Sequence, residues 1–256
     1  MTERDTAWPA GTPCWVDITT ADPDAARAFY GELFGWQLEI ENHESISYTI
    51  ALAHGRPVAG IGVCPPNASA PASWTTYLAT DDATATVAKI TAAGGRVLMP
   101  ILDVMGEGMM AVAADPTGGV FGIWQAGRYP GFTLANVAGA DVWNELMTSD
   151  FAAAKKFYTA VFDHTCADMG GAGLDYATLS VGGRVVAGVG AAEPGAASHW
   201  RAYFGVEDPD ATLAKVTSLG GRVLRPAADS PFGRWGEAAD PQGATFAVVT
   251  PPTEVD

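Results

Sequence analysis

The sequence repeats itself at a nearly constant spacing, and this repeat limits the possible folds more than any other feature. The segment GGRVL occurs at residues 94–98 and again at 220–224. Matches in the first part of the repeat are 128 positions apart, and later ones are 126 or 125 apart. Such ordered self-similarity indicates a tandem duplication with short loop deletions. The other matched pairs are Trp15 with Trp143, Phe29–Tyr30 with Phe157–Tyr158, Phe34 with Phe162, Tyr48 with Tyr176, Trp74 with Trp200, Tyr77 with Tyr203, and Asp115–Pro116 with Asp240–Pro241.

The repeat divides the chain into two domains and a connecting segment. We expect an N-terminal domain at residues 1–126, a linker at 127–139 and a C-terminal domain at 140–256. Hydrophobic residues make up 48% of the chain, so each domain has enough apolar surface to bury a core of its own.

Each half contains two helix signals among several short strand signals. The first helix is predicted to begin at Asp22–Pro23, an acidic N-cap before proline, and to end at Gly35. The second is predicted from Asp82 to Gly94–Gly95, and the twins of both helices begin at Asp150 and Asp208. Alternating or continuous apolar segments predict strands near 15–18, 48–52, 58–63, 75–79, 109–113 and 120–124. The order is βαβββ twice in each half, which predicts an α+β fold of four βαβββ modules.

Charge and cysteine content exclude several classes of function. The chain has 14 Lys and Arg residues against 29 Asp and Glu residues, a net charge of −15. Such an acidic surface argues against nucleic acid and against an anionic membrane as partners. Three cysteines without CxxC spacing do not predict a disulfide framework or a zinc site. No apolar run approaches the ~18 residues of a membrane span. Residues 1–5 lack the pattern of a secretory signal, so we expect a cytoplasmic monomer or homodimer.

Several motifs resemble those of a known superfamily. The first helix contains Asp22–Asp24, Phe29–Tyr30 and Leu33–Trp36, and the two halves close with Asp115–Gly118 and Asp240–Gly243. With the βαβββ order, these segments resemble the vicinal oxygen chelate superfamily, which includes glyoxalase I, bleomycin-resistance proteins and extradiol dioxygenases. The resemblance implies that the modules curl in pairs into two glyoxalase-like half-barrel cups.

The resemblance also implies where a metal would be held. Members of the superfamily usually bind a divalent metal inside the cup through His, Glu or Gln. The corresponding positions here hold Trp15, Thr75 and Gly122 in one set and Trp143, Arg201 and Ala247 in the other, with residues 59–61 and 187–189 on the fourth strands. None is a good ligand for a divalent ion. We therefore expect a branch that uses no metal and no cofactor.

The four histidines offer little support for a metal site. His43, His54 and His164 are expected to be exposed polar residues beside hairpins and a helix end. His199 lies two residues before Arg201 and could share its face of the strand, so a metal site there stays open. The sequence has no Gly-rich phosphate loop before a helix, so nucleotide binding has no support.

Strand alternation predicts which side chains face into the cups. In both cups the inner positions combine aromatic rings with one carboxylate, Asp17 or Glu145. Gly122 and Ala247 predict an open cavity, because small residues leave volume. Asn144 breaks the pattern, since it falls on a nominally apolar side. The inner sets are Trp15, Asp17, Thr75, Tyr77, Val120, Gly122 and Trp124, and Trp143, Glu145, Arg201, Tyr203, Thr245, Ala247 and Val249.

Two functions fit these inner faces. The first is the binding of a planar hydrophobic small molecule by the aromatic residues, as the resemblance to bleomycin-resistance proteins implies. The second is a metal-independent enzyme, such as a lyase, an isomerase or a natural-product tailoring enzyme of the kind labelled hydroxylase or dioxygenase. In it Asp17 or Glu145 would be the acid or base. Alternatively, the aromatic rings only fill the interior and the carboxylates are paired. The sequence also leaves open whether Arg201 meets Glu145 within one half or Asp17 across the two halves.

Overall fold

The computed structural model describes residues 1–43, 46–64, 71–169 and 175–251, and it confirms the four predicted βαβββ modules. In the N-terminal half the first module is β2 (Pro13–Thr20), α1 (Pro23–Phe34), β3 (Gln37–His43), β4 (Ile46–Ala53) and β5 (Arg56–Val63). The second is β6 (Ser73–Ala79), α2 (Ala83–Ala92), β7 (Arg96–Asp103), β8 (Gly108–Ala114) and β9 (Val120–Ala126).

The C-terminal half repeats this order. Its modules are β11 (Asp141–Thr148), α3 (Phe151–Phe162), β12 (Thr165–Asp168), β13 (Tyr176–Val181) and β14 (Arg184–Ala191), then β15 (His199–Gly205), α4 (Pro209–Ser218), β16 (Arg222–Ser230), β17 (Gly233–Ala239) and β18 (Thr245–Val249). A small sheet that the sequence did not predict pairs β1 (Thr2–Glu3) with β10 (Leu134–Ala135) in the linker.

The helices begin where the sequence predicted. Asp22, Asp82, Asp150 and Asp208 are N-caps, and each carboxylate accepts a hydrogen bond from the backbone N–H three residues further on. Gly35 ends α1 in the left-handed conformation, with φ of 70°. Its counterpart in α3 is Asp163, which adopts the same conformation at φ of 57° without being glycine.

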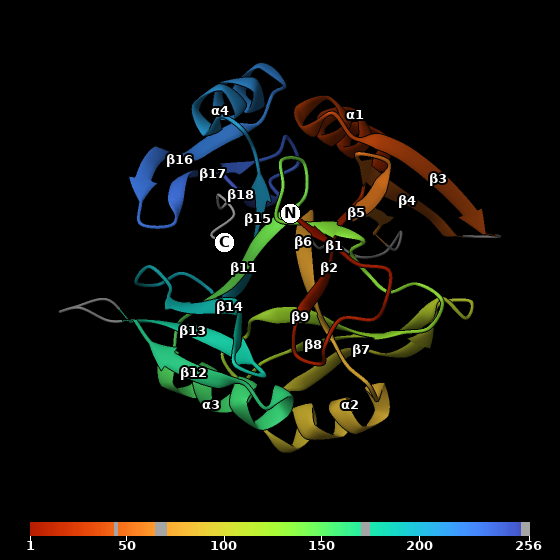
Figure 1. The fold of residues 1–256 in the computed structure, drawn as a ribbon, viewed down its shortest axis with the longest axis vertical. Coiled ribbons are helices and arrows are strands. Elements are labelled where there is room, and N and C mark those ends of the chain that lie inside the picture. Colours follow the sequence, from red (N-terminus) through yellow and green to blue (C-terminus); the bar gives the residue numbers. More distant parts are fainter. Residues whose placement is uncertain (44–45, 65–70, 170–174, 252–256) are drawn as a thin grey trace.

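Each half forms its own eight-stranded sheet. The orders are β3-β4-β5-β2-β6-β9-β8-β7 and β12-β13-β14-β11-β15-β18-β17-β16. The two modules of a half meet along an antiparallel central pair, where Asp17 pairs with Thr75 and Glu145 with Arg201. Each sheet curls into a half-barrel cup (Figure 1). The cups therefore form within the halves, and Arg201 lies beside Glu145.

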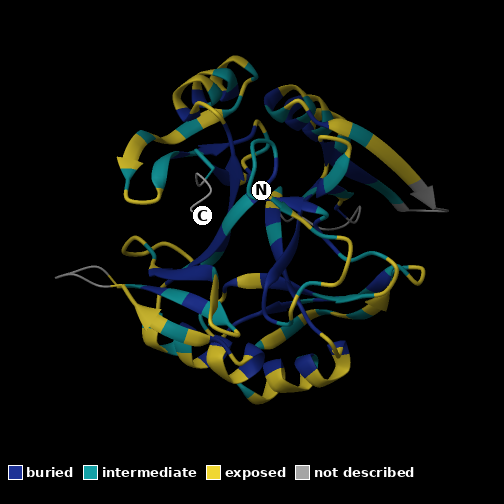
Figure 2. Ribbon diagram, viewed as in Figure 1, coloured by how far each residue is buried: buried dark blue, intermediate teal, exposed yellow. Residues whose placement is uncertain are grey.

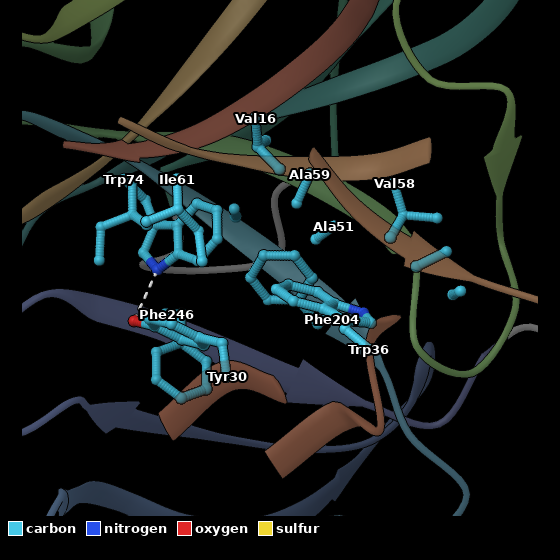
Figure 3. Close-up of a cluster of buried hydrophobic side chains, with 14 of the residues drawn as sticks. Val16, Tyr30, Trp36, Ala51, Val58, Ala59, Ile61, Trp74, Phe204 and Phe246 are labelled. Carbon is cyan, nitrogen blue, oxygen red and sulfur yellow. Dashed lines mark hydrogen bonds between the residues drawn. The ribbon is translucent and has the colours of Figure 1, made fainter. Parts of the chain in front are cut away.

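The hydrophobic cores, in contrast, form between the halves. One core joins the first module to the fourth, with Tyr30 packed against Phe246 and Trp36 against Phe204 (Figure 3). The other core joins the second module to the third in the same way. Accordingly, α1 lies beside α4 and α2 beside α3 (Figure 1), and the buried strands lie between these two helix pairs (Figure 2).

Two repeated motifs meet across this boundary. The Tyr30 hydroxyl donates to Asp240 Oδ2 at 3.1 Å, and the Tyr158 hydroxyl donates to Asp115 Oδ2 at the same distance. Both carboxylates also accept backbone N–H groups of their own turns. The Phe-Tyr and Asp-Pro segments thus recur because each supports the opposite half.

Buried polar contacts explain two residues that did not follow expectation. Asn144, which broke the apolar pattern, accepts a hydrogen bond from Thr76 of the other sheet at 2.7 Å and donates to Asp141. His164 is not exposed as predicted, because it is 2% accessible and packs against Tyr158 and Phe162. Its Nε2 donates to the Gly11 carbonyl at 2.8 Å.

Among the helices in the described part of the chain, none combines the length and the apolar character that crossing a membrane requires.

Candidate functional site

The concave face of the N-terminal sheet carries a carboxylate surrounded by phenols. We call this face the N-terminal cup. Asp17 Oδ2 accepts hydrogen bonds from the hydroxyls of Tyr48 at 3.1 Å and Tyr77 at 3.2 Å. The Trp15 indole donates to the Tyr48 hydroxyl at 2.9 Å, so a continuous series of hydrogen bonds links Trp15 through Tyr48 to Asp17. The other carboxylate oxygen, Oδ1, is buried and has no hydrogen-bond partner among the described side chains and backbone.

The surroundings of Asp17 favour its protonated form. Burial raises the pKa of Asp17 to about 7, against the smaller lowering effects of the hydrogen bonds from Tyr48 and Tyr77. Burial, reinforced by the nearby Asp17 charge, also holds the pKa values of both tyrosines well above their usual range. The phenols are therefore donors, and Asp17 is the group in this cup that can change its charge near neutral pH.

Glycines in the sheet make room for the tyrosines. A Cβ on Gly60 would lie 1.9 Å from the Tyr48 hydroxyl, and one on Gly122 would lie 2.1 Å from the Tyr77 ring. The C-terminal half repeats this at Gly188, where a Cβ would lie 2.2 Å from the Tyr176 hydroxyl. The expectation that Gly122 leaves an open cavity is therefore wrong, because the Tyr77 ring takes that volume.

The concave face of the C-terminal sheet, the C-terminal cup, contains the same cluster with a cation added. Glu145 Oε1 accepts a hydrogen bond from the Tyr203 hydroxyl, and Oε2 accepts one from the Tyr176 hydroxyl at 3.2 Å. Arg201 donates to Glu145 through Nη1 at 3.2 Å and contacts Glu237 of β17 through Nη2 at 3.3 Å. Its Nε is buried without a partner. Two carboxylates thus share one guanidinium that is 13% exposed.

The tryptophans of the two cups have different neighbours. Trp15 is 7% exposed and lies against the rings of Tyr129 and Phe132, at centroid distances of 5.4 and 5.6 Å. Trp143 lies within hydrogen-bonding reach of Tyr176 and is half-buried. Within the described residues, the Trp143 ring has no aromatic ring stacked on it or packed edge-on. The aromatic surface of the C-terminal cup is therefore the more accessible one.

The residues of the cups do not fit a divalent metal. The positions to which the resemblance assigns ligands hold Trp15, Thr75 and Gly122, and the side chains nearest to Asp17 are phenols. Across residues 1–43, 46–64, 71–169 and 175–251, no three His, Cys, Asp or Glu side chains lie together as metal ligands would. His199 is bonded to the carbonyl of Ala197, and the side chain of His43 lies outside the described residues.

The structure brings the predicted site residues together in two groups. Trp15, Asp17, Tyr77 and Trp124 share the N-terminal cup with Thr75, and Trp143, Glu145, Arg201 and Tyr203 share the C-terminal cup. Sequence reasoning missed Tyr48, Tyr129, Tyr176, Trp235 and Glu237. The repeat had already matched Tyr48 with Tyr176, and cross-strand pairing with the glycine-containing strands could have placed them. Glu237 and Tyr129 have no such signal.

Comparison with known proteins gives a consistent assignment. The profile described as Glyoxalase/Bleomycin resistance protein/Dioxygenase superfamily matches residues 14–123 and 139–248. A Mycobacterium tuberculosis protein named "Putative glyoxylase CFP32" is 42% identical over 94% of this chain and 95% of its own length. The anthracycline biosynthesis protein DnrV of Streptomyces peucetius is 36% identical over 95% of this chain and 94% of its own.

Solved structures confirm the fold. The Mn(II)-bound glyoxalase from Novosphingobium aromaticivorans superimposes with a TM-score of 0.67 at 18% identity, covering 97% of this chain and 84% of that one. The 2,2',3-trihydroxybiphenyl 1,2-dioxygenase of Sphingomonas wittichii gives 0.65 at 16% identity, covering 96% and 92%. The expected resemblance is confirmed: the chain belongs to the glyoxalase/bleomycin resistance protein/dioxygenase superfamily, with one match to it in each half.

Proposed function

We propose that the C-terminal cup binds a planar, oxygen-bearing aromatic small molecule without a metal. The observation that carries the proposal is the half-buried Trp143 ring, which has no ring partner in the described part of the chain, beside the ionic cluster of Glu145 and Arg201. Its twin Trp15 is enclosed by two rings. A flat apolar surface next to a few polar groups is the usual form of a small-molecule site.

The polar groups define the chemistry that the ligand would need. Arg201 offers donors to a carbonyl, phenolate or carboxylate oxygen, and its buried Nε has no hydrogen-bond partner among the described residues. Glu145 accepts hydrogen bonds and can receive one from a ligand hydroxyl. Trp235, whose ring lies 5.7 Å from that of Tyr203, adds apolar surface on the neighbouring strand. A ligand with both ring area and oxygen substituents uses all of these contacts.

Two relatives support the aromatic character of the ligand. DnrV and the 35% identical DauV of Streptomyces sp. are both named as anthracycline biosynthesis proteins. Because anthracyclines are built on planar fused rings that carry oxygen, these names agree with a cup lined by tryptophan and arginine. The proposal takes from them a class of ligand and not a particular compound.

Titration with 2-naphthol tests the proposal. We expect one site by calorimetry, unchanged after exhaustive dialysis against EDTA. Trp143→Ala removes the apolar surface and should weaken binding by about 1.5–3 kcal/mol. Glu145→Gln should change it by about 1 kcal/mol, the scale of one hydrogen bond.

The matched control is Leu98→Ala, which removes an exposed apolar side chain from β7 of the N-terminal half. Its affinity for 2-naphthol should equal that of the parent. Equal affinity in the parent and in Trp143→Ala, or loss of binding on metal removal, would contradict the proposal.

A second candidate, a metal-independent enzyme, is favoured by the carboxylate in the N-terminal cup. A base with a pKa of about 7 matches the requirements of proton transfer at neutral pH, and burial brings the pKa of Asp17 to that value. If Asp17 is the base, turnover rises as the pH rises through about 7, since the carboxylate must be ionised. Asp17→Asn should then lower turnover by roughly 10²–10⁴-fold. If Glu145 is the base instead, Glu145→Gln should lower turnover to the same extent and leave ligand binding nearly unchanged.

A further inference from the structure

A segment of the linker crosses the mouth of the N-terminal cup. This segment, residues 127–133, is called the strap. At one end the backbone N–H groups of Gly127 and Tyr129 donate to the Glu107 carbonyl at 2.9 and 3.0 Å. At the other end Phe132 N–H donates to the Cys14 carbonyl at 2.7 Å. The strap thus runs from the β7–β8 hairpin to the first residues of β2.

The strap is fitted closely to the sheet. Gly131 has a φ of 98°, and a Cβ there would lie 2.3 Å from the Cys14 carbonyl oxygen, so only glycine allows this approach. Beside the hairpin, Arg128 forms an ion pair with Glu107. These two anchors fix the path of the residues between them, and Tyr129 is held over the concave face.

Tyr129 places its ring against the aromatic wall of the cup. Its ring packs edge-on against Trp15, with centroids 5.4 Å apart and an interplanar angle of 89°. It packs similarly against Trp124, at 6.4 Å and 85°, and the Trp124 indole donates to the Tyr129 carbonyl at 3.0 Å. Two of the tryptophans predicted to bind a ligand are therefore in contact with a phenol that belongs to the chain itself.

The hydroxyl of Tyr129 distinguishes it from the other tyrosines. The chain has seven tyrosines, and in the other six the hydroxyl donates a hydrogen bond to a carboxylate. The Tyr129 hydroxyl is buried and has no hydrogen-bond partner in the part of the chain that the structure describes. A second polar atom in this cup, Asp17 Oδ1, also has none. The ring is thus well packed while its polar end is unsatisfied, which is unusual for a buried core tyrosine.

We propose that the N-terminal cup is a second ligand site, and that Tyr129 of the strap occupies the position of a hydroxylated aromatic ring of the ligand. The backbone anchors keep Tyr129 from moving further into the cup. A free phenol has no such tether, so its hydroxyl can reach the unpartnered Asp17 Oδ1 while its ring contacts Trp15 and Trp124.

The C-terminal half supports this assignment by contrast. The Trp143 ring, equivalent to Trp15, has no ring packed against it among the described residues. Among the described residues, the position that the Tyr129 ring takes in one cup thus holds no aromatic ring in the other. That both cups accept the same class of ligand rests on the proposed function.

Removal of the Tyr129 side chain should expose the second site. We expect Tyr129→Ala to bind one more equivalent of 2-naphthol than the parent protein in calorimetric titration. In the double variant Tyr129→Ala/Trp143→Ala, the added site should bind 2-naphthol roughly tenfold more tightly than naphthalene, since one hydrogen bond to Asp17 distinguishes the two probes. Tyr129→Phe, which keeps the ring in place, should retain the parent stoichiometry.

The added equivalent of 2-naphthol is counted relative to the parent, whether or not the C-terminal cup binds the probe. The test can therefore be interpreted even if the proposed function is wrong. Glu107→Gln provides a second variant that weakens the strap without truncating a buried ring. It should reveal the added site at higher 2-naphthol concentrations. The proposal is overturned if neither variant gains a site. It is also overturned if the added site binds naphthalene as well as 2-naphthol, because a simple void would do that.

Discussion

The two cups are built from the same side chains and differ in what compensates their carboxylates. Each has a tryptophan, two tyrosines and one carboxylate at equivalent positions of the sheet. Glu145 faces Arg201, whereas Asp17 pairs with Thr75 at the corresponding position, and no cation lies beside it among the described residues. The N-terminal cup is also covered by the strap. One cup is therefore enclosed and has an uncompensated carboxylate, while the other is more accessible and contains an ion pair.

The largest expected difference between the cups concerns the tryptophans. Trp15→Ala should lower the free energy of unfolding by about 3–5 kcal/mol, because it empties a buried position between two rings. Trp143→Ala should lower the free energy of unfolding by clearly less, since the Trp143 ring is half-buried. Urea denaturation of both variants measures the difference. Equal losses of the free energy of unfolding in the two variants would show that both cups are equally enclosed, which contradicts the difference described above.

The next difference concerns pH. The pKa of Asp17 is raised to about 7 by burial, above the value near 3.8 in the unfolded chain. Its contribution to stability is therefore complete below pH ~4 and is lost as the pH rises through about 7, by on the order of 4 kcal/mol. Asp17→Asn removes this loss, so the variant should gain stability relative to the parent between pH 4 and 8.

The matched position in the other cup should respond in the opposite direction. Glu145→Gln breaks an ion pair with Arg201, so it should lower stability at neutral pH. Denaturation curves of the parent and both variants at several pH values make the comparison. If the free energy of unfolding changed with pH in the same way in the parent and in Asp17→Asn, the carboxyl of Asp17 would not be the source of the pH dependence.

The smallest difference should come from single hydroxyls. Tyr48→Phe leaves the Trp15 indole and Asp17 short of one partner each in an enclosed site, at a cost of about 1–3 kcal/mol. Tyr176→Phe removes the equivalent contacts with Trp143 and Glu145, but Trp143 is half-buried and Glu145 keeps the hydrogen bonds from Tyr203 and Arg201. A smaller cost of about 0.5–1.5 kcal/mol is therefore expected. Thermal unfolding of the two variants should rank them in this order, and the reverse order would contradict the assignment of the closed cup.

Local signals were enough to predict the order of the elements. Asp22, Asp82, Asp150 and Asp208 are helix caps whose effect acts within one turn, and strand alternation sorted Trp15 and Asp17 from Val16 and Ile18. The pairing of modules could not be predicted in this way. A strand with a correct inward face can pair within its half or across halves, and alternation is identical in both.

The errors have equally physical causes. Gly122 was interpreted as empty space, since nothing local shows that the Tyr77 ring would fill it. His164 was assigned to the surface because its partners, Gly11 and Tyr158, include one far away in sequence. Tyr129 lies in a linker outside the repeat, and so neither the spacing nor the alternation pointed to the residue that covers the N-terminal cup.

The exchange of partners between sheets and cores has a consequence for how the chain can be divided. Each half closes its hydrogen-bonded sheet alone but supplies only one side of each core, and Tyr30 and Tyr158 find their carboxylates in the opposite half. A half expressed alone would therefore leave two apolar surfaces in water. Two separately produced halves should complement each other on mixing, as the fragments of a split protein do, and folding of the intact chain should be a single cooperative event.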